Sequence, residues 1–175
     1  ISNIVFMGMG EPLLNYKNVM RSIHFITSEE GLNMSYKRIT LSTSGISKMI
    51  RKLADDNVKV NLALSLHAAN EELRKKIMPI GKSNTLEEIR DSLKYYFSKT
   101  KKKVTYEYVL LRDVNDSIED AYQLYKYTKH LSSKVNIIEY NTVEGLEFKK
   151  SSFEKTEKSI GYLLKKGVNV SLRRS

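Results

Sequence analysis

The stretch Val60–His67, Val-Asn-Leu-Ala-Leu-Ser-Leu-His, decides the fold, because apolar residues alternate in it with small or polar ones. Such alternation is typical of a β-strand with one face on a core and the other toward a polar space. A strand covered by helices on both faces of an open parallel sheet would be apolar throughout. The stretches Arg38–Ser42 and Val168–Arg173 alternate in the same way. These strands therefore predict a barrel or part of a barrel, with a polar ligand in its lumen.

On either side of this stretch the hydrophobic period switches between two and 3.6 residues. We expect six strands, at Asn3–Met9, Arg38–Ser42, Val60–Leu66, Val104–Leu110, Val135–Tyr140 and Val168–Arg173. Helical apolar stripes separate them, at positions 19–26, 46–54, 86–97, 118–125 and 153–164. This alternation predicts parallel strands joined by right-handed crossovers. The expected fold class is α/β, a partial (βα) barrel, and no linker divides residues 1–175, so we expect one domain.

The composition favours an anionic partner and excludes thiol chemistry. The chain has 175 residues and a formal net charge of +10, which favours nucleic acid, although a lysine-rich composition alone would also produce it. There is no cysteine, so disulfides and thiolate metal sites are excluded within this sequence. No apolar run reaches the ~18 residues of a transmembrane helix. We therefore expect a cytoplasmic protein with no membrane partner.

Polar residues follow the first two strands, at the edge where a barrel binds its ligands. Gly10 permits a sharp turn or a close approach to a ligand, and Glu11 places a carboxylate there. Ser42 has the parity of the polar face, which favours a ligand role. Ser44 is expected to cap the helix that begins near position 47.

The later strands carry further polar residues. Ser65 and His67 share the polar face of the third strand, although a lone histidine is more often structural. Glu107 lies on the opposite face of its strand from Tyr106 and Tyr108. Positions 115–116, Asn-Asp, favour a turn. Together these residues predict a polar, enzyme-like pocket without specifying its reaction.

Several strings resemble one enzyme family, in family order and spacing. Val5–Asn15 (VFMGMGEPLLN), Thr40–Gly45 (TLSTSG) and Ser65–Ala68 (SLHA) closely resemble the radical S-adenosylmethionine (SAM) adenine C2-methyltransferases of ribosomal and transfer RNA. Further matches lie at positions 72–74, 77–80, 107–110, 115–116 and 135–141, so the resemblance covers nearly the whole chain. The first string alone narrows the field to this family and a close relative that methylates adenine C8.

The resemblance implies a partial (βα) barrel of the radical SAM type, with SAM across the lumen beside a [4Fe-4S] cluster. Gly10 and Glu11 would contact the methionine moiety, with Glu11 accepting from its ammonium group. Ser42 would bind the same end of SAM.

The resemblance assigns the other end of SAM to later strands. Ser65, Leu66 and His67 would line the ribose and adenosine side. Asn141 would hydrogen-bond the adenosine portion. No residue of this sequence matches a catalytic or metal-binding position of the family.

The implied reaction transfers a methyl group from SAM to C2 of an adenine in 23S rRNA and tRNA. In the family it is a radical mechanism with two SAM molecules, in which a cysteine of the enzyme carries the methyl group. The implied partners are 23S rRNA, tRNA and an electron donor such as flavodoxin, and the implied state is a monomer. C2 is favoured over C8 because it is the commoner housekeeping activity.

The sequence departs from the family in lacking every cysteine. The C-x3-C-x2-C cluster motif and an accessory domain would precede Ile1, and the methyl-carrying cysteine would follow residue 175. We therefore expect a segment of a longer enzyme that is inert by itself, because no cluster can be held without thiolates. Two alternatives remain: a non-catalytic SAM- or RNA-binding relic of the barrel, and an unrelated barrel enzyme for a phosphorylated metabolite.

Overall fold

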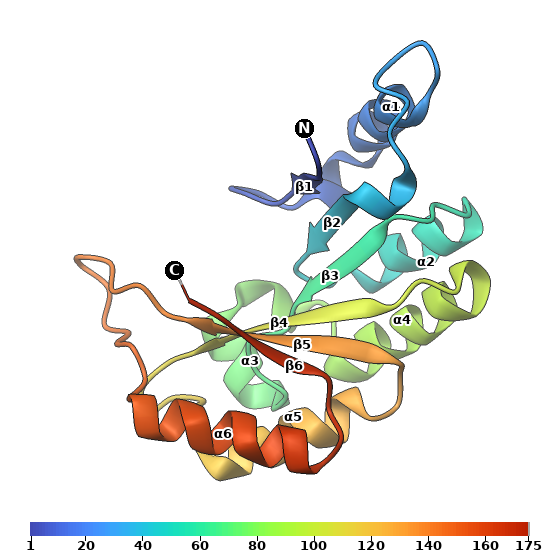
Figure 1. Cartoon of the computed structure of the whole chain (residues 1–175). Helices are drawn as coiled ribbons and strands as arrows, with labels where there is room; N and C mark the ends of the chain where they lie inside the picture. The colour runs from blue at the N-terminus through green and yellow to red at the C-terminus, as the bar shows by residue number, and fades with distance from the viewer. Residues whose placement is uncertain (175) are drawn as a thin grey trace. The chain divides into compact units, whose positions relative to one another are not determined.

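In a computed structural model that describes residues 1–174, strands and helices alternate along the chain (Figure 1). The strands are β1 (Ile4–Phe6), β2 (Ile39–Thr43), β3 (Asn61–Ser65), β4 (Val104–Leu110), β5 (Ser133–Glu139) and β6 (Val170–Arg173). The α-helices are α1 (Tyr16–Thr27), α2 (Ser47–Asp55), α3 (Glu71–Ile77), α4 (Leu86–Thr100), α5 (Ile118–Thr128) and α6 (Phe153–Lys165). The 3₁₀ turns are η1 (Pro12–Asn15), η2 (Tyr36–Arg38) and η3 (Pro79–Lys82). All six expected strands are present, which confirms the α/β prediction.

The order of the strands in the sheet follows their order in the chain, from β1 to β6. Pairing is parallel where its register is defined, with Leu41 opposite Leu62 and Val135 opposite Val170. A doubly wound sheet would reverse its strand order at a switch point. The unreversed order is that of repeated βα units, as the alternating strands predicted.

The chain forms two compact units, which are described one at a time. Unit 1 comprises Ile1–Ser65 and Glu87–Val104. Unit 2 comprises Leu66–Leu86 and the described chain from Thr105 onward. The expectation of one domain over residues 1–175 remains a prediction.

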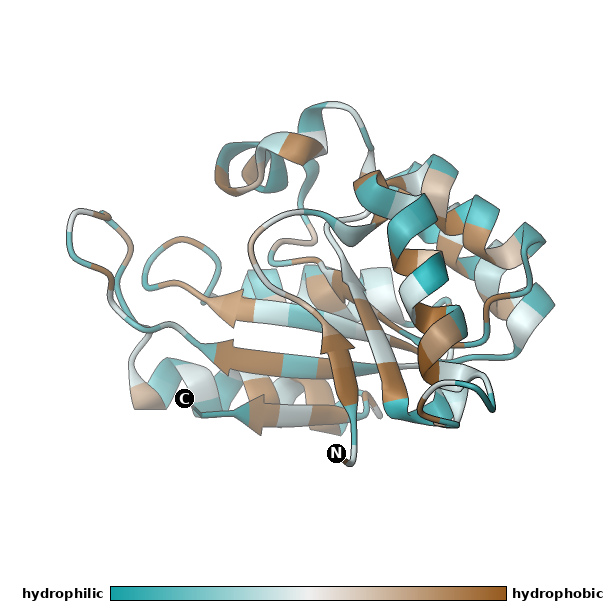
Figure 2. Cartoon of the chain, turned by 90° about the horizontal axis from the view of Figure 1, so that it is seen from above, coloured by the Kyte–Doolittle hydropathy of each residue, from teal (hydrophilic) through white to brown (hydrophobic). Residues whose placement is uncertain are grey.

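In unit 1 the core lies on one face of β2 and β3. Leu41 and Leu64 are fully buried, together with Leu53 of α2 and Leu93 of α4. On the other face, residues such as Asn61 are only partly buried. Figure 2 shows hydrophobic and hydrophilic residues interleaved along several of the strands. The alternation that predicted a polar second face is thus confirmed in this unit.

In unit 2, α5 and α6 pack against each other, but they bury only part of the stripes expected. Leu124 and Leu163 are buried, whereas the predicted core residues Tyr122 and Phe153 are 41% and 69% exposed. Tyr122 lies under the Lys126 ammonium group, with 5.3 Å between the nitrogen and the ring centroid. A tyrosine can remain at the surface in this way, because its ring attracts a cation. The stripe prediction is thus wrong at Tyr122 and Phe153 and confirmed at Ala121 and Leu163.

Candidate functional site

The carboxylate of Glu11 holds the loop that follows β1. Its Oε1 accepts a hydrogen bond from the backbone N–H of Leu13 at 3.0 Å. Its Oε2 accepts from the backbone N–H and the hydroxyl of Ser44, both at 2.6 Å. Gly10, directly before it, has φ +108, a conformation that favours glycine. Glu11 therefore ties the η1 turn to the loop after β2.

The loop between β2 and α2 differs from the expectation at Ser44. The N-cap of α2 is Ile46, which has no side chain able to cap, so the prediction that Ser44 caps this helix was wrong. The hydroxyl of Ser44 instead donates to Glu11. Gly45 has φ +100, and a Cβ there would lie 2.8 Å from Cδ1 of Ile89. The loop thus needs glycine both for its backbone and for the close approach of α4.

Ser42 and Ser65 lie on neighbouring strands of unit 1. Ser42 is opposite Ala63, two residues before Ser65. Ser42 is 7% exposed, and Ser65 is partly exposed at the end of β3. Unit 1 therefore brings four of the predicted residues to the carboxyl ends of three adjacent parallel strands, and these are Gly10, Glu11, Ser42 and Ser65.

In unit 2, the backbone N–H, the backbone carbonyl and one ring nitrogen of His67 all form hydrogen bonds. Its N–H donates to the carbonyl of Glu107 at 3.3 Å, and its carbonyl accepts from Asn115 Nδ2 at 2.7 Å. The backbone N–H of Val109 donates to Nδ1 of the ring at 3.2 Å. His67 has φ +55, which is uncommon for a residue other than glycine. Its conformation is thus imposed by its neighbours.

These contacts also define the protonation of His67. Burial, and secondarily the positive charge of Arg74, lower the pKa of His67 to about 4. The imidazole is therefore neutral near pH 7. Because Nδ1 accepts from a backbone N–H, the ring proton is on Nε2. His67 can offer a neutral N–H donor without carrying a charge.

We expect the free energy of unfolding of the ligand-free chain to fall by about 2–3 kcal/mol as the pH falls from 6.5 to 4. In this window the unfolded chain binds a proton at His67 and the folded chain does not, so acid favours unfolding. Above the unfolded pKa of 6.5 both states are neutral and the contribution is fully present. Urea denaturation at several pH values should show a flatter profile for His67→Gln. His24→Gln, at an exposed position of α1, is the control, and an equal flattening in it would contradict this assignment.

Asn115 is a structural residue that sequence reasoning treated only as part of a turn. The turn is present, since the N–H of Asn115 donates to the carbonyl of Leu111. In addition, its buried side chain accepts from the N–H of Leu111 and donates to the carbonyls of His67 and Val109. Nothing in the local sequence distinguishes this role from an ordinary Asn-Asp turn. Of the carbonyls to which the side chain donates, that of His67 is 48 positions away and that of Val109 belongs to β4.

The two remaining residues of the predicted set are Leu66 and Asn141, and their surroundings differ from each other. Leu66 is fully buried, and its N–H donates to the carbonyl of Glu107 at 3.0 Å. Asn141 is exposed, two residues beyond the end of β5. Within unit 2, Leu66 and His67 are therefore joined through Glu107, whereas Asn141 lies in the loop that leaves the sheet.

The polar face of unit 2 carries a hydrogen-bonded chain across three strands. Asn136 of β5 donates from Nδ2 to Oε1 of Glu107 on β4 at 2.9 Å. The hydroxyl of Ser171 on β6 donates to Oδ1 of Asn136 at 2.6 Å. Glu107 is 5% exposed, and its Oε2 is buried without a hydrogen-bond partner in the described chain. The sequence placed Glu107 in the predicted polar pocket but assigned no ligand to any of these three residues.

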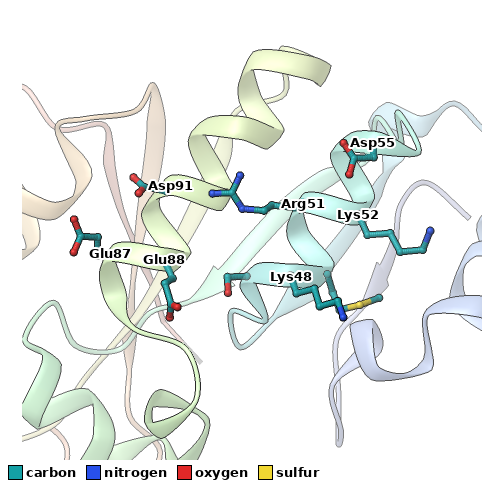
Figure 3. Close-up of a pocket in the computed structure, with 9 residues that line it drawn as sticks. Lys48, Arg51, Lys52, Asp55, Glu87, Glu88 and Asp91 are labelled. Atoms are coloured by element: carbon teal, nitrogen blue, oxygen red, sulfur yellow. The ribbon is translucent and has the colours of Figure 1, made fainter.

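A charged groove on unit 1 lies away from the strand ends, between α2 and α4 (Figure 3). Basic residues line it from α2 and acidic ones from α4, and these are Lys48, Arg51, Lys52, Glu87, Glu88 and Asp91. Tyr95 joins the two helices, since its hydroxyl donates to Asp55 at 2.6 Å and Arg51 lies 5.5 Å from its ring centroid. These contacts explain the groove as helix packing, and we assign it no ligand.

Two further properties bear on function. The described residues contain no group of three or more histidine, cysteine or acidic side chains that could hold a metal ion. No helix in the described part of the chain is long and apolar enough to cross a membrane.

Comparison with known proteins identifies the superfamily. Residues 2–125 match the model of the radical SAM superfamily. A "probable dual-specificity RNA methyltransferase RlmN" of Flavobacterium psychrophilum is 54% identical over 175 residues, which are all of this chain and 50% of the relative. The protein of the same description from Christiangramia forsetii is 51% identical with the same coverage. The chain thus spans about half the length of the curated relatives it matches.

A solved structure agrees with these relatives. The crystal structure of a radical SAM methyltransferase from Sphaerobacter thermophilus superposes with a TM-score of 0.96 at 37% identity, over all of this chain and 51% of that one. This agreement confirms the predicted fold class, and the match to the family model confirms the resemblance on which the sequence interpretation depended. Since that model covers more than half of its length, the chain belongs to the radical SAM superfamily.

Proposed function

We propose that this chain is the SAM-binding part of an RNA methyltransferase that methylates C2 of an adenine in 23S rRNA and tRNA by a radical mechanism. The observation that carries the proposal is 51–54% identity, over the whole chain, to proteins named as RNA methyltransferases. A formal net charge of +10 suits an RNA substrate. A cytoplasmic monomer that acts with an electron donor such as flavodoxin is part of the same proposal.

The side chains at the strand ends suit SAM, an amino acid joined to a nucleoside. SAM supplies the methyl group and is one of the two cofactors that membership of this superfamily implies. Glu11 offers a carboxylate for an ammonium group, and Ser42 offers a hydroxyl for the same end. A carboxylate has about four lone-pair sites, and the chain occupies three of those of Glu11, which leaves one on Oε1. Glu11 can therefore accept from a ligand without releasing its own loop.

The residues proposed for the adenosine end of SAM are Ser65, Leu66, His67 and Asn141. His67 would donate from Nε2 as a neutral group, which avoids placing a second positive charge near the sulfonium of SAM. Its backbone is held by Asn115, so its position does not depend on the ligand. Leu66 would exclude water, because it is fully buried beneath the strand end.

The second cofactor that the superfamily implies, a [4Fe-4S] cluster, does not fit the residues of this chain. Cluster irons are held by cysteine thiolates, and the sequence has none. The proposal therefore requires cysteines from outside this sequence, and it predicts that the 175 residues by themselves do not methylate RNA.

A chimera tests the proposal. This chain replaces the matching half of the Flavobacterium psychrophilum relative, which is then expressed in a host that lacks 2-methyladenosine in its RNA. We expect mass spectrometry of digested rRNA and tRNA to detect 2-methyladenosine with the chimera and none with the 175-residue chain alone. The unmodified relative is the positive control.

The other outcomes favour the alternatives. Detection of 8-methyladenosine would assign the C8 activity instead. A folded chimera that binds SAM but yields no methylated adenosine would favour a non-catalytic relic. Methylation by the 175-residue chain alone would contradict the requirement for outside cysteines.

A further inference from the structure

The carboxylate of Glu107 is a buried charge with one of its oxygen atoms unused. Oε1 accepts from Asn136 at 2.9 Å, whereas Oε2 is buried and has no hydrogen-bond partner in the described chain. The residue is 5% exposed, and no ion pair within residues 1–174 involves it. Leaving such an acceptor unsatisfied costs free energy, so natural structures rarely keep one without a reason.

The neighbours of Glu107 hold this oxygen in place. Ser171 donates to Oδ1 of Asn136 at 2.6 Å, so the amide of Asn136 must point its Nδ2 toward Glu107. Each of the three neighbouring strands β4, β5 and β6 supplies one member of this chain of hydrogen bonds. Asn136 and Ser171 are only partly buried, so the polar face on which they lie is accessible beside Glu107. The site selects for donors, because a carboxylate only accepts.

The position of Glu107 relates it to the proposed adenosine end of SAM. Its backbone carbonyl accepts from the N–H groups of Leu66 and His67, at 3.0 and 3.3 Å. Both of those residues are proposed to line the nucleoside. Adenosine carries donors of two kinds, the ribose hydroxyls and the 6-amino group. A buried carboxylate oxygen is a suitable acceptor for either kind.

We propose that Oε2 of Glu107 accepts a hydrogen bond from an adenosine, a role that neither parity nor the matching motif assigned to this residue. This inference rests on the proposed function. In that function two ligands contain an adenosine, namely SAM and the target nucleotide of the RNA. The chain Glu107–Asn136–Ser171 then orients the nucleoside before reaction.

The test is Glu107→Gln in the chimera of this chain with the Flavobacterium psychrophilum relative, with Glu147→Gln, at an exposed loop position, as the matched control. The amide keeps an acceptor for Asn136 but turns an NH₂ group toward the ligand. Isothermal titration calorimetry measures the Kd for SAM, and fluorescence anisotropy measures the Kd for an adenine-containing RNA hairpin. Thermal melting without ligand is the third measurement.

We expect Glu107→Gln to raise the Kd of at least one of the two ligands about tenfold or more, as for the loss of a hydrogen bond to a charged group. Because the variant removes a half-paired buried charge, its ligand-free Tm should stay the same or rise by about 2–5 °C. Weaker SAM binding alone would identify the cofactor as the source of the adenosine, and weaker RNA binding alone would identify the target nucleotide. The control should match the wild type throughout.

Ser171→Ala is the second variant, in case Glu107→Gln does not fold. It leaves the carboxylate in place and releases the amide of Asn136, so a loss of about two- to fivefold in the same affinity is expected. Affinities within twofold of wild type for both ligands in the folded variants would overturn the inference alone. A wild-type chimera that binds neither SAM nor RNA would overturn the proposed function, and the inference with it.

Discussion

Asn115→Asp is expected to lower the free energy of unfolding by about 3–5 kcal/mol, the largest stability effect of any single substitution considered for unit 2. Asn115 is 1% exposed, and its Nδ2 donates to the carbonyl oxygens of His67 and Val109 at 2.7 and 2.8 Å. Aspartate has nearly the same shape but would place an oxygen against those two oxygens. A buried charge would then face two acceptors, with the N–H of Leu111 as its one donor. Urea denaturation of the 175-residue chain, followed by circular dichroism, measures the loss.

Two companion variants separate repulsion from the loss of contacts. Asn115→Ala removes the same hydrogen bonds without adding a charge, so its loss should be smaller, about 2–3 kcal/mol. Asn169→Asp makes the same chemical change at an exposed position before β6 and should leave stability within about 0.5 kcal/mol of wild type. A loss in Asn115→Asp no larger than in Asn115→Ala would show that the carboxylate escapes to water.

The strands could be predicted from the sequence because each of them has one buried face and one polar face. Because successive side chains point to opposite faces, hydrophobic residues alternate with others in stretches such as Asn61–Ser65. This alternation does not depend on which strands are the neighbours. Helix ends carry local signals of a different kind, which fail at Ser44 of the loop before α2. They are present elsewhere, since Ser117 and Asp120 form a capping box at the start of α5 and Gly167 has φ +76 after α6.

Helix faces were predicted less well, since a helix can expose an aromatic side chain that a lysine covers. Tyr125 of α5 was expected in the core, but the ammonium groups of Lys129 and Lys166 lie over its ring at 5.8 and 5.7 Å. The helix α3 was not predicted at all, because it is short. Its signals were present in Asn70, which caps it, and in acidic residues in its first turn and basic ones in its last.

Residues of the candidate site could be predicted only where their position in an alternating strand, or a family motif, identified them one by one. Parity and motif both selected Ser42, Ser65 and His67, and the structure places each of them at the end of a strand. What neither could supply were contacts between distant residues. Glu11 meets Ser44 across 33 positions, and Glu107 meets Asn136 across 29. Pattern within one element carries no information about which polar groups another element will bring to it.

Glu11→Gln is expected to weaken SAM binding about tenfold or more, because a charge-assisted hydrogen bond contributes roughly 1.5–3 kcal/mol. The same change should lower the free energy of unfolding by about 1–3 kcal/mol. Glutamine has one acceptor oxygen, so its NH₂ group must face either the N–H of Leu13 or the donors of Ser44. Isothermal titration calorimetry of the complete enzyme measures the first effect, and urea denaturation of the 175-residue chain measures the second.

Ser44→Ala distinguishes a direct contact of Glu11 with SAM from an effect through the loop. This variant removes the hydroxyl that donates to Oε2 of Glu11 at 2.6 Å and leaves the carboxylate charge intact. If Glu11 accepts from the ligand ammonium, Ser44→Ala should lower the free energy of unfolding by about 1 kcal/mol. The affinity for SAM should then stay within threefold of wild type. If Ser44→Ala instead weakens SAM as much as Glu11→Gln does, the carboxylate acts by holding the loop. Unchanged affinity in Glu11→Gln would remove Glu11 from the proposed site, and the ammonium of SAM would then need another acceptor.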